Sequence, residues 1–249
     1  MVSGKYSALA GAISRQQAIN NISNNLANVN TTGFKKSNVA FEAILKGKQQ
    51  IGNDQGINYS RVHQNKTDFS QGAFRSTENP LDLAIQGEGF FKLQGPNGIL
   101  YTRRGDFGIR SDGVLTTRHG LPVLSQDGEE ITIPETQISQ IAFADDGTIF
   151  IMGAQGQRQE VGKVGVVNIK DPSLLKKEAD TTFSLEAGGQ EIDPENAQVL
   201  QGSLEISNVN TIQMMAQLID NQRIFETLNK AIKSYSKISE QQEKLGRLS

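Results

Sequence analysis

The sequence predicts an α+β fold, in which the N- and C-terminal helices pair as a coiled-coil-like α layer. A central all-β domain, either a sandwich or a distorted barrel, lies between them in the chain. Three observations predict this fold. Both ends of the 249-residue chain carry apolar residues at helical spacing, the middle alternates with a period of two, and Asx-Gly dipeptides punctuate the middle.

The first helix is expected from about Ser3 to Asn28, and it ends where Asn30 and Gly33 supply turn residues. Residues 1–33 therefore form the first part of the inner helical domain. Its apolar positions recur three, four or seven residues apart, which places them on one stripe: Leu9, Ala12, Ile19, Ile22, Leu26 and Val29.

Residues 34–70 are polar and irregular, and we expect an extended connector arm with one short helix or strand. Val39, Phe41, Ile44 and Leu45 are its main apolar cluster. Long structureless segments are uncommon in compact domains, so we expect this arm to contact a partner.

Residues 71–204 form the expected all-β outer domain. Four Asx-Gly pairs, which favour the positive φ angles of tight hairpin turns, end at Gly98, Gly113, Gly128 and Gly147. The expected strands are 83–93, 99–102, 107–110, 114–117, 122–124, 131–133, 138–143, 149–152, 161–169 and 183–186.

Residues 205–249 return to helical spacing and complete the inner helical domain. Ser207, Asn208 or Asn210 can cap the last helix, which continues to Gly246. Its inward-facing positions are expected to be Leu218, Ile224, Phe225, Leu228, Ala231, Tyr235, Ile238 and Leu245. A stripe this narrow needs another helix beside it, so the two ends are expected to pair in an assembling subunit.

Composition excludes several classes of function. The net charge of −2 and the dispersed Lys and Arg residues argue against a nucleic-acid partner. The absence of cysteine removes disulfides, thiolate catalysis and Cys-ligated metal sites. The N-terminus lacks the apolar run of a cleavable signal peptide, and the amide-rich flanks of the first helix argue against membrane insertion.

Candidate sites for catalysis are also weak, so we expect no enzyme, no cofactor and no metal. His63 and His119 have no carboxylate companions at ligand spacing and are interpreted as solvated loop residues. The segment 87–89 is interpreted as a bulge or tight bend, and 145–147 as a hairpin turn instead of a calcium loop. Arg103-Arg104 is interpreted as a solvated strand end with local pairing.

Four segments carry a family resemblance. They are NNLANVNTTGFKK at 24–36, NPLDLAIQGEGFFKL at 79–93, YTRRGDFGIRSDGVL at 101–115, and SNVNTIQMMAQLIDNQRIFETLNKAIK at 207–233. In this order they resemble the bacterial flagellar basal-body rod and hook proteins. The positions that match the family motif and hinge are Asn24, Asn25, Leu26, Ala27, Asn28, Thr32, Gly33, Phe34, Lys35, Ser207, Asn208, Val209 and Asn210.

The resemblance implies a structural subunit whose paired terminal helices form the inner tube of an axial assembly. The short arm favours the proximal rod, and a distal rod or short hook-type subunit is the alternative. The implied partners are copies of itself, other rod proteins, the surrounding rings and the export apparatus. The implied location is the periplasmic part of the basal body, reached through the flagellar type III channel without signal cleavage. The alternative class of function is a binding module, in which the β domain binds a ligand and the helices serve for oligomerisation.

Overall fold

The computed structural model describes residues 2–46, 57–134, 141–152, 157–179, 181–194 and 196–246, and within these ranges it does not describe the side chains of residues 2–4, 40–46, 57–65, 239 and 242–246. The chain divides into two compact units. The helical unit comprises residues 1–27, 37–68 and 209–249, and the β unit comprises 28–36 and 69–208. Each unit is built from segments that are far apart in the sequence.

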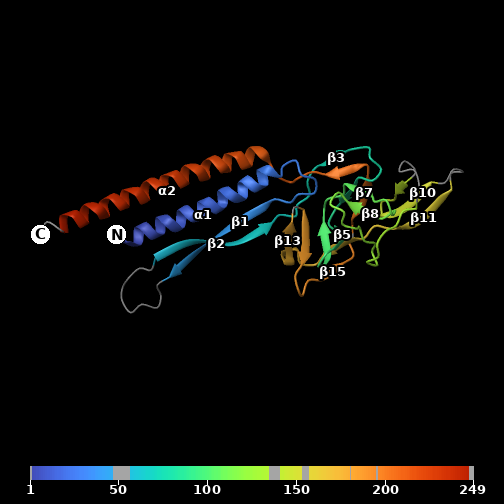
Figure 1. Cartoon of the computed structure of the whole chain (residues 1–249), viewed down its shortest axis with the longest axis horizontal. Helices are drawn as coiled ribbons and strands as arrows, with labels where there is room; N and C mark the ends of the chain where they lie inside the picture. Colours follow the sequence, from blue (N-terminus) through green and yellow to red (C-terminus); the bar gives the residue numbers. More distant parts are fainter. Residues whose placement is uncertain are drawn as a thin grey trace. The chain divides into compact units, whose positions relative to one another are not determined.

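Two helices dominate the helical unit: α1, Val2–Ala27, and α2, Thr211–Gly246. They pack against each other in antiparallel fashion (Figure 1), as the sequence predicts. Nη1 of Arg15 donates to Oδ1 of Asn221 at 3.1 Å, and a Cβ added to Gly11 would lie 3.4 Å from Leu228. As residue numbers rise along α1, the numbers of the α2 residues beside them fall, so the two helices are antiparallel. At 1.5 Å per residue, α2 is about 54 Å long and α1 about 39 Å.

The expected connector arm is a β-hairpin that belongs to the helical unit. Strands β1, Ser37–Lys46, and β2, Ile57–Thr67, pair antiparallel from Ser37↔Thr67 to Lys46↔Ile57, with a bulge between Ala40 and Phe41. Both strands contact α1. The hairpin was not predicted because β2 is mostly polar, so its alternation carries no apolar face.

The described residues of the β unit form short strands and one 3₁₀ turn. Its elements are β3 (Phe74–Ser76), β4 (Leu83–Gln86), β5 (Phe90–Gly95), β6 (Gly98–Thr102), β7 (Phe107–Ile109), β8 (Leu115–Thr117), β9 (Ile141–Phe143), β10 (Thr148–Met152), β11 (Arg158–Lys163), β12 (Val166–Ile169), η2 (Pro172–Leu174), β13 (Leu175–Ala179), β14 (Thr182–Leu185), β15 (Glu191–Ile192), β16 (Gln198–Gln201) and β17 (Ser203–Glu205).

The largest sheet of the β unit has six strands in the order β13-β14-β6-β5-β12-β15. Smaller sheets are β11-β10-β9, β16-β4, β17-β3 and β7-β8. Every pair named here is antiparallel, and the described strands form open sheets, so the barrel alternative is not observed among them. Alternating residues of β5 face two cores: Phe91 and Leu93 join the larger one, and Phe90 joins the smaller one with Phe183 and Tyr101.

The four predicted Asx-Gly turns are confirmed, whereas some of the predicted strands are interrupted in the structure. Gly98, Gly113, Gly128 and Gly147 all have positive φ. The bend at 87–89 separates β4 from β5, where one strand was expected, because Gly87 and Gly89 adopt φ values of 98° and 144°.

Other expected strands differ in extent. Residues 122–124 and 131–133 form only isolated bridges, and residues 164–165 separate β11 from β12. Residues 138–140 lie outside the described part of the chain.

Candidate functional site

The apolar stripe of α1 is only partly buried. Ala12 and Ile22 are buried, and Ile19 and Leu26 are half-buried, whereas Leu9 is 45% exposed. Val29, the last stripe position, lies beyond the helix end and is half-buried. The stripe therefore faces α2 and the hairpin at its centre but not near its start.

The stripe of α2 is less buried. Leu218, Phe225, Leu228 and Ala231 are half-buried, whereas Ile224, Tyr235 and Ile238 are exposed. Leu245 lies within α2, and its side chain is outside the described part. The Leu228 side chain lies against α1 beside Gly11, where an added Cβ would be in ordinary van der Waals contact with it.

Rows of large apolar side chains remain exposed on both helices. On α1, Tyr6 and Ile13 accompany Leu9, with exposures of 56% and 52%. On α2, Ile212, Met215 and Ile219 are 83%, 52% and 50% exposed. Each set follows the i, i+3, i+7 spacing of a single helix face. Contiguous exposed apolar rows of this kind mark surfaces that bind other protein.

Asn25, a motif position on α1, holds the start of the hairpin. Its Nδ2 donates to the carbonyl oxygen of Ser37 at 2.8 Å, and its Oδ1 accepts from the Ser37 N–H at 3.0 Å. Asn25 is buried, and these two bonds satisfy its side-chain amide and both backbone polar groups of Ser37, the first residue of β1. The neighbouring motif residues Asn24 and Ala27 are exposed.

The second asparagine-rich motif, at 207–210, has a comparable role. Oδ1 of Asn208 accepts from the Lys36 N–H at 2.8 Å, and its Nδ2 donates to the carbonyl oxygen of Ser70 at 3.1 Å. Oδ1 of Asn210 accepts from the Gln213 N–H at 3.1 Å and so caps α2. Ser207 and Val209 are buried.

The first motif continues into the β unit as the segment 28–36. Asn28 accepts from the N–H and the Oγ1 of Thr31, both at 3.1 Å, which forms the turn after α1, and Thr32 is half-buried. Gly33 donates its N–H to the carbonyl oxygen of Glu205 at 2.8 Å and has φ 67°. A Cβ at this position would lie 2.4 Å from the backbone nitrogen of Arg104. Only glycine fits here, six residues beyond the helix end.

Phe34 and Lys35 are both about 1% exposed. The Nζ of Lys177 lies 4.1 Å from the centroid of the Phe34 ring, a cation–π arrangement. Nζ of Lys35 lies 2.6 Å from Oε1 of Glu205 and also donates to the carbonyl oxygen of Ser70 at 2.7 Å. A lysine this deeply buried is tolerated only with such partners.

Arg103 completes this buried charge cluster of Lys35, Arg103 and Glu205. Its Nη1 lies 3.4 Å from Oε2 of Glu205 and donates to the carbonyl oxygen of Ile85, and its Nη2 donates to that of Gly87 at 2.8 Å. Burial lowers the pKa of Arg103, and the Glu205 charge opposes this shift. Two cations therefore share one carboxylate inside the β unit.

The interpretation of Arg103 as a solvated strand end is wrong, because its partner Glu205 is 102 residues away and no local pattern reveals it. Local pairing does hold for Arg104, whose Nη2 donates to Oδ2 of Asp106 at 2.9 Å. Sequence reasoning missed Glu205 entirely. His119 is exposed beside Arg104, and the side chain of His63 lies outside the described residues.

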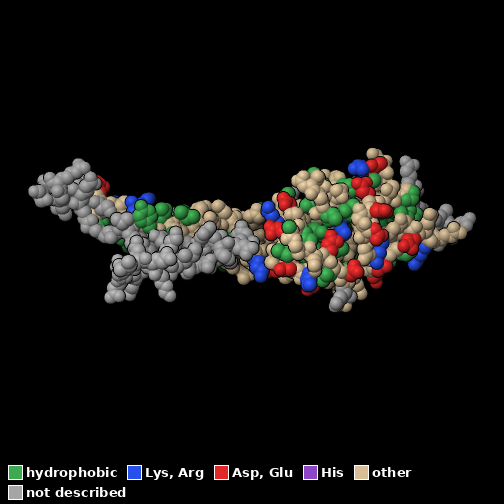
Figure 2. All heavy atoms as spheres, turned by 90° about the horizontal axis from the view of Figure 1, so that it is seen from below, with side chains coloured by type: hydrophobic (Ala, Val, Ile, Leu, Met, Phe, Trp, Pro, Cys, Tyr) green, Lys and Arg blue, Asp and Glu red, His purple; other side chains and the backbone are tan. Residues whose placement is uncertain are grey.

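The described residues contain no group of three or more His, Asp or Glu side chains placed to hold a metal ion. The turn at 145–147 is a hairpin turn between β9 and β10, as predicted, and hydrogen bonds from Thr148 lower the pKa of Asp146. Neither helix, as far as it is described, is long and apolar enough to cross a membrane. Figure 2 shows acidic and basic side chains interspersed over one face of the β unit.

Comparison with known proteins identifies the relatives of the chain. Three families match in sequence order: "Flagella basal body rod protein" at residues 6–35, "Flagellar hook protein FlgE/F/G D1 domain" at 84–151, and "Flagellar basal body rod FlgEFG protein C-terminal" at 200–245. The flagellar basal-body rod protein FlgG of Bacillus subtilis is 32% identical over 96% of this chain and 97% of its own length. The chain belongs to the flagellar basal-body rod protein family.

A second relative of this rod protein family, FlgF of Caulobacter vibrioides, is 31% identical over 98% of both chains. FlgG of Borreliella burgdorferi is also 31% identical, over 94% of this chain and 95% of its own. Relatives of both names match equally well, so the comparisons do not separate FlgF from FlgG. The first matched segment covers most of α1 and extends to Lys35, and the last covers β17 and most of α2. These two segments contain the exposed apolar rows together with Lys35 and Glu205 of the buried charge cluster, and Arg103 lies in the middle match.

Proposed function

We propose that this chain is a structural subunit of the bacterial flagellar rod, without catalytic activity. Its terminal helices assemble with those of other subunits into the inner layer of a helical tube, which transmits torque and encloses the export channel. The observation that carries the proposal is the row of large apolar side chains that stays exposed on each helix. Tyr6, Leu9 and Ile13 on α1, and Ile212 and Met215 on α2, remain exposed in a single chain.

The energetics agree with assembly through these helices. Each exposed apolar side chain would contribute roughly 1.5–3 kcal/mol if a neighbouring subunit buried it fully. Ordering a helical residue costs about 1–2 kcal/mol of backbone entropy. A single antiparallel pair buries too few stripe residues to offset that cost along two long helices, so neighbours supply the remainder.

The partners follow from this role. We propose contacts with further copies of the chain, with other rod proteins and with the rings around the rod, at a periplasmic location. The chain would reach this location through the flagellar type III export channel with its N-terminus intact. The short segment 34–70 favours a position in the proximal rod, because a distal subunit is expected to carry a longer insertion here.

Imaging of isolated basal bodies tests this proposal. An epitope inserted in the exposed turn at Asn97-Gly98 should label the rod close to its membrane end, and deletion of the chain should abolish motility and leave basal bodies without a complete rod. A chain missing from purified basal bodies, or a fully motile deletion strain, would refute the proposed function. Labelling at the end of the rod that joins the hook would refute only the proximal assignment.

A further inference from the structure

The chain passes between its two compact units at four places: 27/28, 36/37, 68/69 and 208/209. The side chain of Asn208 joins three of these passages. Its Oδ1 accepts from the Lys36 N–H at 2.8 Å, and its Nδ2 donates to the carbonyl oxygen and to the Oγ of Ser70, both at 3.1 Å. These three residues all belong to the β unit, so three passages leave that unit side by side.

A second set of bonds ties the same segments together. Nζ of Lys35 donates to the Ser70 carbonyl oxygen as well as to Glu205, and Oε1 of Glu205 also accepts from the Gly72 N–H at 2.7 Å. Separating this pair would leave Lys35 buried without its counter-ion. The bonds that hold the three segments together thus lie within the β unit and involve no residue of either helix.

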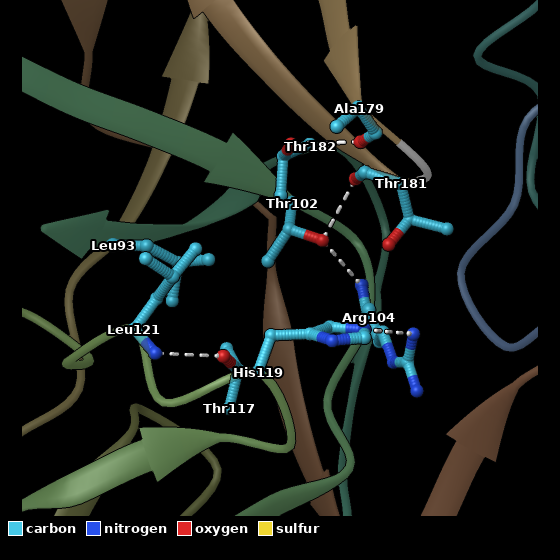
Figure 3. A pocket seen from close by; sticks show the side chains of 9 residues that line it. All are labelled: Leu93, Thr102, Arg104, Thr117, His119, Leu121, Ala179, Thr181 and Thr182. Atoms are coloured by element: carbon cyan, nitrogen blue, oxygen red, sulfur yellow. Dashed lines mark hydrogen bonds between the residues drawn. The ribbon is translucent and has the colours of Figure 1, made fainter. Parts of the chain in front are cut away.

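The backbone against which Gly33 packs is also fixed within the β unit. Gly33 lies so close to Arg104 that an added Cβ would overlap its backbone nitrogen. Oγ1 of Thr102 accepts from the Arg104 N–H at 3.0 Å and donates to the carbonyl oxygen of Thr181 at 2.9 Å (Figure 3). The segment after α1 is consequently held by the β unit at Gly33 and again at Lys36.

Asn25 and Asn210 continue this arrangement in the helical unit. The Ser37 N–H donates to Oδ1 of Asn25, whereas the N–H of the preceding residue, Lys36, donates to Asn208. Asn210 caps α2 two residues after Asn208. The end of α1, the start of β1 and the start of α2 are therefore each fixed beside a passage.

Burial along the helix pair decreases away from these passages. On the face of α1 that contacts α2, Ile22 and Ala18 are buried, whereas Ala8, nearer the chain end, is half-buried. On α2, Met214 is buried, whereas Tyr235 is 37% exposed. Apolar burial is the main stabilising contribution in such a pair, so the pair is most stable beside the passages.

We propose that the clamp formed by Asn208, Lys36 and Ser70 is the point from which the helical unit orders, and that the two helices pair outward from it toward the chain ends. Forming the first turn is the unfavourable step of helix formation, because it fixes several residues for one hydrogen bond. The clamp also brings the three segments together before the helices meet. It closes loops whose ends, Lys35 and Ser70 or Ser70 and Asn208, are 35 and 138 positions apart.

The inference deepens the proposed function, on which its biological role rests. The exposed α1 row of Tyr6, Leu9 and Ile13 lies in the part of the helix that orders last. In a single copy this part gains little from pairing, and a neighbouring subunit would supply the missing burial. The clamp thus keeps the helical unit partly ordered in the free chain and leaves its completion to assembly.

Hydrogen exchange of the purified full-length monomer, followed by mass spectrometry, tests the clamp. The test variant is Asn208→Ala, which removes the side-chain bonds to Lys36 and Ser70. The matched control is Asn210→Ala, because this asparagine belongs to the same motif and its side chain caps α2. Asn208→Asp is a second variant, whose carboxylate still accepts from the Lys36 N–H but cannot donate to Ser70.

In the wild type, protection should fall along α1 from its end toward Val2 and along α2 from its start toward Gly246, and it should stay below that of β5 and β6. Asn208→Ala should speed exchange by about tenfold in the second half of α1, the start of β1 and the first half of α2, and by less than about twofold in β5 and β6. Asn210→Ala should speed exchange in α2 alone.

Trypsin provides an independent measurement, because it cleaves after lysine and Lys36 adjoins a passage. The Lys36–Ser37 bond should be cut about tenfold faster in Asn208→Ala than in the wild type or in Asn210→Ala. Equal rates of cleavage at this bond in all three proteins would contradict the clamp.

Even protection along both wild-type helices, or a maximum at their middle where Leu228 lies beside Gly11, would overturn the inference. An effect of Asn208→Ala confined to α2 would mean that Asn208 acts only locally on this helix, and would contradict the clamp. If Asn208→Ala also lowers protection in β5 and β6, Asn208→Asp decides. It must speed exchange in the same three segments while β5 and β6 stay protected, and otherwise the inference fails.

The outcome is separate from that of the proposed function. All these measurements use the monomer, so a failed clamp leaves the proposed rod function standing. Absence of the wild-type chain from purified basal bodies would refute the rod function and leave the order of helix formation unchanged.

Discussion

Nζ of Lys35 lies 2.6 Å from Oε1 of Glu205, a residue 170 positions later in the chain, and both side chains are buried. The pair joins the segment after the first helix to the last strand before the second. The β unit thus includes nine residues from the N-terminal region, 28–36, although the rest of it begins at Phe69. Its stability consequently depends on the family motif around Gly33.

Replacing the shared carboxylate should destabilise the β unit strongly. Glu205→Gln leaves Lys35 and Arg103 buried without their counter-ion, so we expect the free energy of unfolding to fall by about 3–5 kcal/mol. Urea denaturation followed by circular dichroism measures this. Asp112→Asn, which breaks an exposed pair with Arg110, is the control and should change stability far less. Similar losses in both variants would contradict the role of the buried cluster.

Gly33→Ala should also destabilise the β unit. The left-handed backbone costs roughly 1–2 kcal/mol for a residue with a Cβ, and the new Cβ would overlap the Arg104 backbone nitrogen. Gly120→Ala provides a matched control, since Gly120 has φ 80° and open space around the added atom. Thermal unfolding should show a clearly larger drop for Gly33→Ala than for Gly120→Ala. Equal drops would mean that only backbone strain matters.

Stability should fall at alkaline pH through Tyr101. Burial and the 2.5 Å hydrogen bond to Glu191 raise the pKa of Tyr101 above its usual value near 10. The folded state therefore keeps its proton at a pH where the unfolded state loses it. This contribution is complete below pH 10 and is lost as pH rises toward the folded pKa.

The test compares the wild type with Tyr101→Phe by urea unfolding at pH 9 and pH 11. The stability advantage of the wild type over Tyr101→Phe should shrink by on the order of 1 kcal/mol between these values. Tyr6→Phe, which removes an exposed phenol, is the control. A constant difference between wild type and Tyr101→Phe would contradict the assignment.

Leu26 and Phe225 are half-buried in the single chain, and we predict that assembly buries both. Leu26→Asp or Phe225→Asp would place an unpaired carboxylate in the helical layer at a cost of several kcal/mol. Each variant should express as soluble protein with a cooperatively folding β unit, yet fail to enter basal bodies. Normal incorporation of Phe225→Asp, or an assembled structure with this ring in solvent, would contradict the prediction.

The terminal helices should be less protected than the β unit in the free chain, since much of their apolar surface is exposed. Hydrogen exchange measured on the monomeric protein should show fast exchange for amides of α1 and α2 and slow exchange in β5 and β6. In assembled rods the helical amides should become protected. Slow exchange along α1 in the monomer would mean that the antiparallel pair is stable alone.

The sequence by itself determined the features that arise from local patterns. Helical spacing placed α1 and α2 within one or two residues of their observed ends, and the narrow stripes indicated that the two ends pair. Asx-Gly dipeptides marked four turns correctly, because positive φ is a property of the residue itself. The motif residues Gly33 and Asn210 were likewise recognisable from residue type and position.

Only the tertiary structure decided what depends on residues distant in the chain. Strands β1 and β2 pair with each other and contact α1, and β2 is mostly polar, so no alternating apolar face in its sequence predicts this pairing. Glu205 contacts Lys35 and Arg103, which precede it in the sequence by 170 and 102 residues. Whether a charged side chain is buried beside a counter-ion or exposed to water depends on tertiary contacts. The residues next to it in the sequence do not reveal which of the two occurs.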